Sequence, residues 1–125
     1  MKAVQFTHPG EPDVLQLQEV PDPTSGPDDV LIEVKATTVN RLDIFQRNGS
    51  RPISQLPFTP GLEAAGVVVQ DANGFRSGER VMTTSAMQAK GGGGYAGKIA
   101  APASSLARIS RNNAASGGVC SSFTR

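Results

Sequence analysis

The sequence predicts a mainly β fold with short helices. Fourteen glycines and nine prolines are spread over 125 residues, and both residue types interrupt regular structure. Only 38% of the residues are hydrophobic, which indicates a loop-rich β domain rather than a helical bundle. Several short runs alternate apolar and polar residues with the period of two that is typical of strands. The chain fits one domain and is long enough to bury a hydrophobic core.

The first 39 residues predict three strands. Residues 1–7 alternate well enough to form an opening strand, which a Pro-Gly turn closes. Residues 14–20 alternate in the same way and predict a half-buried strand. Residues 21–29, with three prolines and three aspartates, predict a loop. Residues 30–39 give the clearest strand, with Val30, Ile32, Val34 and Ala36 on one face.

Residues 40–48 change to helical spacing. Asn40 is a good N-cap, and Asp43 stands three residues after it, as in a capping box. Gly49 is placed to end the helix. The sequence therefore predicts a short helix that starts at a polar pair.

Residues 62–70 predict a core strand that carries a carboxylate, Glu63. An ionised Glu is almost never fully buried without a partner. Gly61 and Gly66 flank it, where the absence of a side chain permits positive φ or close backbone approach. Together with Asn40 and Asp43, this second polar cluster at a strand end indicates a cleft. The alternative is a capped helix and one paired structural Glu, and the residues alone leave both interpretations open.

The remaining residues predict three more short strands before the pattern stops. One follows the turn at Gly78, one covers 95–100 after a glycine run, and one covers 106–109. Residues 110–125 lack apolar periodicity and are expected to form a disordered or out-of-frame tail. The chain therefore divides into an ordered domain, 1–109, and a tail, 110–125.

Charge and cysteine content exclude several classes of protein. The formal net charge of +1 favours neither nucleic acid nor membrane as a partner. All eleven acidic residues lie at or before Glu79, whereas half of the twelve Lys and Arg residues follow it. This asymmetry indicates either a site for an anionic ligand or a basic half that complements an acidic half. The single cysteine, Cys120, permits no internal disulfide and indicates a reducing compartment, so we expect a cytoplasmic protein.

Three further candidates carry weaker signals. Residues 92–97 match the dinucleotide pattern G-x-G-x-x-G, but a helix should follow that motif and an acidic residue should stand about 20 residues on. Neither is expected here, so a close-approach loop is the better interpretation. His8 is expected to be an exposed turn residue. Arg47 and Arg51 could meet a phosphate or be exposed arginines after a helix.

Six segments of the sequence together resemble a known family: residues 1–4, 30–36, 39–43, 57–68, 78–81 and 93–96. Taken together and in order, these motifs are specific, although none is specific alone. With them, the ordered part of the chain resembles the N-terminal, GroES-like domain of the medium-chain dehydrogenase/reductase superfamily, in its zinc-independent quinone oxidoreductase branch. This resemblance implies a GroES-like, partly open β-barrel.

The resemblance implies metal-free hydride transfer from NADPH to a quinone or an α,β-unsaturated carbonyl. Zinc-dependent members place Cys where Asn40 stands and His where Leu62 stands, so neither zinc ligand is present. By analogy, Asn40 and Phe45 face the nicotinamide and the acceptor. Phe45 replaces a frequent Tyr. Asp43 is implied as a catalytic support beside Asn40, and Glu63 as a support of the cofactor site.

The resemblance stops near residue 109. The family's NADPH-binding Rossmann domain and the C-terminal segment that completes the GroES-like domain have no counterpart in the sequence. We therefore expect a truncated or out-of-frame product that is catalytically incomplete alone, although the family is usually homodimeric. The alternative is a stand-alone GroES-like binding or oligomerisation module without catalysis.

Overall fold

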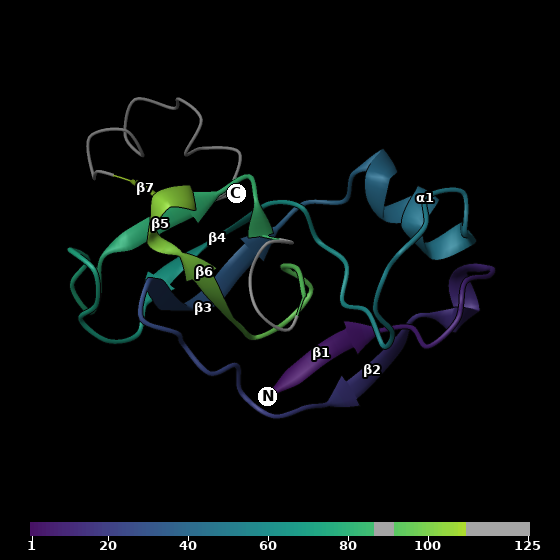
Figure 1. The fold of residues 1–125 in the computed structure, drawn as a ribbon, viewed down its shortest axis with the longest axis horizontal. Helices are drawn as coiled ribbons and strands as arrows, with labels where there is room; N and C mark the ends of the chain where they lie inside the picture. Colours follow the sequence, from purple (N-terminus) through teal and green to yellow (C-terminus); the bar gives the residue numbers. More distant parts are fainter. Residues whose placement is uncertain (87–91, 110–125) are drawn as a thin grey trace.

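Short antiparallel strands form most of the regular structure in the computed structural model, which describes residues 1–86 and 92–109 (Figure 1). Within these two ranges, one α-helix and two 3₁₀ turns accompany the strands. The elements in chain order are β1 (Lys2–Gln5), the 3₁₀ turn η1 (Pro12–Val14), β2 (Gln16–Glu19), β3 (Asp29–Thr37), α1 (Arg41–Asn48), β4 (Ala64–Val68), β5 (Arg80–Thr83), β6 (Lys98–Pro102), the 3₁₀ turn η3 (Ala103–Ser105) and β7 (Ala107–Arg108).

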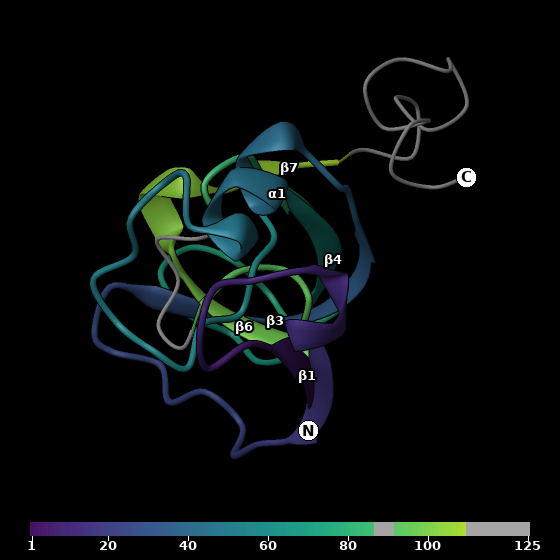
Figure 2. The same ribbon diagram turned by 90° about the vertical axis from the view of Figure 1, so that its right-hand side faces the viewer.

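Five strands form one sheet in the order β6-β3-β4-β5-β7, and β1 and β2 form a separate antiparallel pair. The pair meets the rest of the chain at an isolated bridge between Ala3 and Ala96 and at another between Phe6 and Phe58. Figure 2 shows β1 in the lower part of the view, near the N-terminus, and α1 above it. The two sheets do not close on each other, so the expected GroES-like, partly open β architecture is confirmed.

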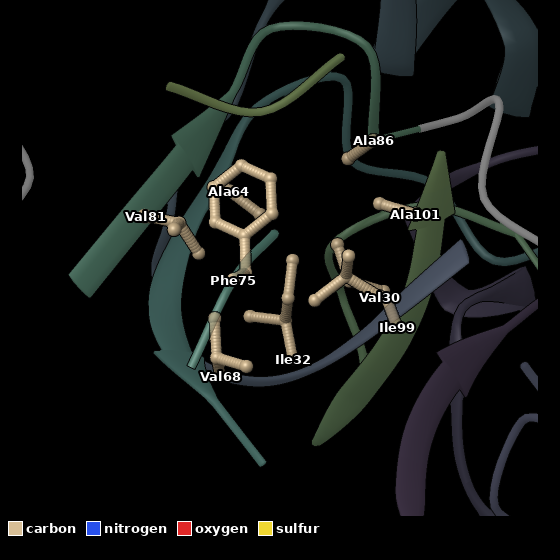
Figure 3. Close-up of a cluster of buried hydrophobic side chains, with 9 residues drawn as sticks. All are labelled: Val30, Ile32, Ala64, Val68, Phe75, Val81, Ala86, Ile99 and Ala101. Atoms are coloured by element: carbon tan, nitrogen blue, oxygen red, sulfur yellow. The ribbon is translucent and has the colours of Figure 1, made fainter. Parts of the chain in front are cut away.

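The core lies between the strands of the larger sheet and the turn that connects β4 to β5. Val30 and Ile32 of β3 point toward Val68 of β4 and Val81 of β5, and Phe75 covers them (Figure 3). All of these side chains are buried. The predicted alternation of β3 is confirmed, because Val30, Ile32 and Val34 pack in this core while Glu33 and Lys35 are exposed.

β3 bends where it passes Gly66 of β4. The register between the two strands shifts between Val34 and Ala36. A Cβ atom at Gly66 would overlap the carbonyl oxygen of Glu33, so only glycine fits this close approach.

Three sequence-based expectations need correction. The second strand is not half-buried: all four residues of β2 are exposed, including Leu17 at 64%, because β2 pairs along one edge with β1 and its face carries no packed layer of described residues. β4 begins at Ala64, so Glu63 stands just before the strand. The strand expected at 95–100 begins at Lys98 instead.

Ion pairs link the acidic and basic parts of the sequence. Lys98 Nζ lies 2.6 Å from Asp22 Oδ2, and Arg108 Nε lies 2.7 Å from Glu79 Oε2. The Arg108 guanidinium also lies over the Phe75 ring, 4.2 Å from its centroid. Among the described residues, these contacts favour complementary charge over an anion site as the reason for the asymmetry.

These pairs predict an acid limb in the stability of the protein. Hydrogen bonds from Lys98 lower the pKa of Asp22, and those from the Arg76 backbone and then Arg108 lower the pKa of Glu79. A carboxyl group whose pKa is lower in the folded than in the unfolded state stabilises the folded state at pH values above the unfolded-state pKa. That contribution is lost as pH falls through the folded-state pKa. We expect Tm to fall between pH 6 and pH 3, and Asp22→Asn to flatten the fall. Because the groups are exposed, 0.5 M salt should weaken the dependence; a salt-independent limb would contradict this origin.

Candidate functional site

The candidate site is built around Asn40, which connects the end of β3 to α1. Asn40 has extended backbone angles and caps the helix. Its backbone N–H donates to Asp43 Oδ2 at 2.8 Å, which is the reach-back bond expected of a capping box. Gly49 ends the helix at φ 90°, as predicted. Local sequence therefore fixes both ends of α1 and places Asn40 at its start.

The Asp43 carboxylate joins three separate segments of the chain. Asp43 is only 4% exposed. Besides the Asn40 N–H, it accepts the backbone N–H of Gly61 at 3.1 Å and the hydroxyl of Tyr95 at 3.1 Å. Each donor offsets part of the desolvation of the buried carboxylate. Asp43 thus holds the start of α1 against the loop before β4 and the loop before β6.

Glu63 reaches the same site from the other side. The Thr38 hydroxyl donates to Glu63 Oε2 at 2.5 Å. The Asn40 side-chain amide donates to Thr38 Oγ1 at 3.0 Å and to Glu63 Oε2 at 3.4 Å. The expectation that Glu63 needs a polar partner is confirmed. The two polar clusters of the sequence, Asn40 with Asp43 and Glu63, meet in space.

Phe45 lies on α1, and its hydrocarbon side chain cannot hydrogen-bond to this network. Its side chain is 44% exposed, and its backbone carbonyl accepts the N–H of Arg51 at 2.9 Å. An exposed aromatic ring near Asn40 in sequence is compatible with a surface that receives an apolar acceptor. The assignment of Phe45 to the acceptor side remains a prediction.

The loop 92–95 crosses the segment 59–61 at backbone contact. The amides of Gly93, Gly94 and Tyr95 donate to the carbonyls of residues 59, 61 and 60 at 2.7, 3.0 and 3.0 Å. A Cβ atom at Gly93 would overlap the carbonyls of residues 60 and 61. The close-approach interpretation of the glycine run is therefore confirmed.

This crossing excludes the dinucleotide interpretation of residues 92–97. A phosphate cradle needs free backbone N–H groups at the start of a helix. Here three successive amides already donate to carbonyls, and strand β6 follows the loop. The G-x-G-x-x-G match is a coincidence of glycine content.

Tyr95 lines an open apolar hollow, and its hydroxyl donates to Asp43. Burial, followed by the negative charge of Asp43 and its hydrogen bond, raises the pKa of Tyr95 above the ordinary value of 10.0. Tyr95 therefore stays protonated and donates to Asp43 at neutral pH. The hollow holds about 500 Å³ and is lined by residues of β1, the second half of β3 and residues 94–96.

The other candidates do not join the site. His8 is exposed and contacts the neighbouring Thr7, as expected of a turn residue. The Arg47 guanidinium donates to the Gly10 carbonyl at 2.6 Å, and Arg51 is exposed. Cys120 lies outside the described residues. Within residues 1–86 and 92–109, no group of His, Cys, Asp and Glu could hold a metal ion, and no helix is long and apolar enough to span a membrane.

A family model described as the alcohol dehydrogenase GroES-like domain matches residues 26–111. That range contains β3, α1 and the network around Asn40, Asp43 and Glu63. The chain belongs to this family. The expected resemblance to the quinone oxidoreductase branch of the medium-chain dehydrogenase/reductase superfamily is confirmed.

Curated relatives and solved structures agree on this branch. The chain is 39% identical over 103 residues to a quinone oxidoreductase of Lama guanicoe, covering 77% of this chain and 29% of that protein. The corresponding values for the quinone oxidoreductase of Sus scrofa are 38% over 101 residues, 77% and 30%. The Escherichia coli quinone oxidoreductase complexed with NADPH superposes with a TM-score of 0.81 at 26% identity, over 90% of this chain and 34% of that one. This GroES-like domain thus spans about a third of the length of these oxidoreductases.

Proposed function

We propose that this chain is the N-terminal, substrate-side domain of an NADPH-dependent oxidoreductase that transfers a hydride to a quinone or an α,β-unsaturated carbonyl. The observation that carries the proposal is the match to quinone oxidoreductases across the segment that contains Asn40, Asp43 and Glu63. The small-molecule acceptor is the partner, and the single cysteine of the sequence fits a reducing, cytoplasmic setting.

Each site residue has a distinct role in this proposal. Asn40 and Phe45 face the nicotinamide and the acceptor, Asn40 through its amide and Phe45 through its exposed ring. Asp43 fixes the Asn40 backbone, and Glu63 fixes the Asn40 side chain together with Thr38. The amide is thereby held in one orientation before an acceptor arrives, which is the kind of preorganisation that lowers a barrier.

In this proposal Asn40 and Phe45 lie on the acceptor side of a nicotinamide site, and the glycine loop before β6 does not supply its phosphate side. The amides of residues 93–95 are committed to backbone carbonyls, so they offer no cradle for a pyrophosphate. NADPH supplies the hydride when it is bound. This chain contributes the surface that receives and orients the acceptor.

A chimera tests the proposed function. Residues 1–109 would replace the matching N-terminal segment of the Sus scrofa quinone oxidoreductase, and NADPH oxidation with 1,4-benzoquinone would be followed at 340 nm. We expect turnover in the chimera, and Asn40→Ala should reduce kcat by about a hundredfold if the amide acts on the transition state. The matched control is Asn48→Ala, which removes an exposed Asn at the far end of the same helix.

Two outcomes would count against the proposal. One is a folded chimera that binds NADPH and reduces neither quinones nor enones. The other is equal activity of the Asn40→Ala and Asn48→Ala chimeras, which would show that Asn40 has no role in the reaction.

A further inference from the structure

We infer that Tyr95 is a positioning residue of this site: its hydroxyl holds the Asp43 carboxylate in the place from which that carboxylate fixes Asn40. The inference rests on the proposed function for its catalytic meaning, since it concerns where Asn40 stands. The contact between Tyr95 and Asp43, and its effect on the position of Asn40, can be tested in this chain without any activity.

The backbone of Tyr95 is held on two sides. Its N–H donates to the Pro60 carbonyl at 3.0 Å, and its carbonyl accepts the N–H of Val4 of β1 at 2.8 Å. These bonds anchor the residue to the loop before β4 and to the β1–β2 pair. The Tyr95 side chain therefore extends from a fixed backbone, and its hydroxyl reaches Asp43 of α1.

The Tyr95 hydroxyl reaches the same oxygen that caps the helix. It donates to Asp43 Oδ2 at 3.1 Å, and Oδ2 also accepts the Asn40 N–H at 2.8 Å. The other oxygen, Oδ1, accepts the Gly61 N–H. Loss of the hydroxyl leaves the Oδ2 atom with one donor fewer and frees the carboxylate to turn. A turned carboxylate no longer meets both backbone amides.

Asn40 passes this constraint on to its side chain. Its backbone is fixed through Asp43, while its amide is fixed by Thr38, which in turn bonds Glu63. A shift of the Asn40 backbone therefore misaligns the amide. By this route Tyr95 acts on Asn40, 55 residues away in sequence, through the carboxylate oxygen that both of them bond.

The experiment exploits the composition of the chain, which contains one tyrosine and no tryptophan. Absorbance of tyrosinate near 295 nm therefore follows Tyr95 alone. At pH 10, we expect about half of the tyrosine to be ionised in 6 M guanidinium and less than about a tenth in the folded chain, since burial and Asp43 oppose ionisation. Asp43→Asn removes the negative charge and should increase the ionised fraction at pH 10. The control, Asp71→Asn, removes an exposed carboxylate in another loop and should not.

Amide hydrogen exchange measures the positioning itself. In Tyr95→Phe, which keeps the ring, we expect the Asn40 and Gly61 amides to exchange about tenfold faster, the effect of losing one hydrogen bond's worth of free energy. The Gly10 amide, which donates to Arg47 at the far end of α1, should be unchanged. Ser105→Ala, which removes a hydroxyl elsewhere, is the control variant.

Each readout can overturn the inference without reference to catalysis. The Tyr95–Asp43 contact would be contradicted by equal ionisation of native and denatured tyrosine at pH 10. It would also be contradicted if Asp43→Asn and Asp71→Asn changed the ionised fraction equally. Unchanged exchange at Asn40 and Gly61 in Tyr95→Phe would leave the contact without a positioning role. An inactive chimera with both readouts positive would count against the proposed function and not against Tyr95.

Discussion

Gly61→Ala is expected to abolish cooperative folding of the domain. Gly61 has φ +116°, a backbone conformation that side chains rarely permit. A Cβ atom there would lie 2.8 Å from the Tyr95 amide nitrogen and closer still to that of Gly94. Both neighbours are backbone atoms in a crossing held by three hydrogen bonds, so neither can rotate away.

The size of the effect follows from combining strain with the loss of the crossing. Left-handed strain costs about 1–3 kcal/mol. Opening the crossing also separates the Tyr95 hydroxyl and the Gly61 N–H from Asp43. We expect strain and lost hydrogen bonds together to lower the free energy of unfolding by more than about 4 kcal/mol, which is a large share of a domain's stability. Urea unfolding followed by circular dichroism should therefore show a cooperative transition for the unsubstituted domain and none for Gly61→Ala.

Gly78→Ala is the matched control for this prediction. Gly78 also has positive φ, at +90°, but a Cβ atom there would meet nothing within 4 Å. It therefore reports strain without overlap, at about 1–2 kcal/mol. If Gly61→Ala were no more destabilised than Gly78→Ala, the close crossing would not exist in solution.

The parts of the fold that the sequence predicts well are those whose signals are local. The alternation over 30–39 reports one buried face, and β3 forms there with that face on the core. Asn40, Asp43 and Gly49 are cap residues within one helix, and α1 has the predicted limits. Gly66 marked a close approach because an isolated glycine in an apolar run needs a reason.

The parts that the sequence missed depend on contacts between distant segments. Tyr95 meets Asp43 across 52 residues, and nothing local in the glycine run announces which carboxylate its hydroxyl finds. Thr38 reads in the sequence as another β-branched strand residue. Its hydrogen bond to Glu63, 25 residues later, becomes visible only in the fold. β6 begins at Lys98 and not at residue 95, because the Tyr95 amide donates to the Pro60 carbonyl and Ala96 forms only an isolated bridge to Ala3 of β1.

Asp43→Ala should lower the free energy of unfolding by about 3 kcal/mol, because it leaves three hydrogen-bond donors without their acceptor. The Asn40 N–H, the Gly61 N–H and the Tyr95 hydroxyl all lose their acceptor, and each unsatisfied buried donor costs about 1–3 kcal/mol. Removing a buried carboxylate that has no ion-pair partner among the described residues relieves its desolvation, so the net loss is smaller than the sum of three donors. Urea denaturation gives the free energy of unfolding.

Asp43→Asn separates the hydrogen bonds from the charge. The amide keeps the shape and one carbonyl acceptor, so it should retain part of the stability that Asp43→Ala loses. Asp71→Ala removes an exposed carboxylate that accepts one loop amide and should change the free energy of unfolding by under about 1 kcal/mol. Were Asp43→Ala no worse than Asp71→Ala, Asp43 would be an ordinary helix cap, and the convergence of three segments on its two oxygens would carry no energy.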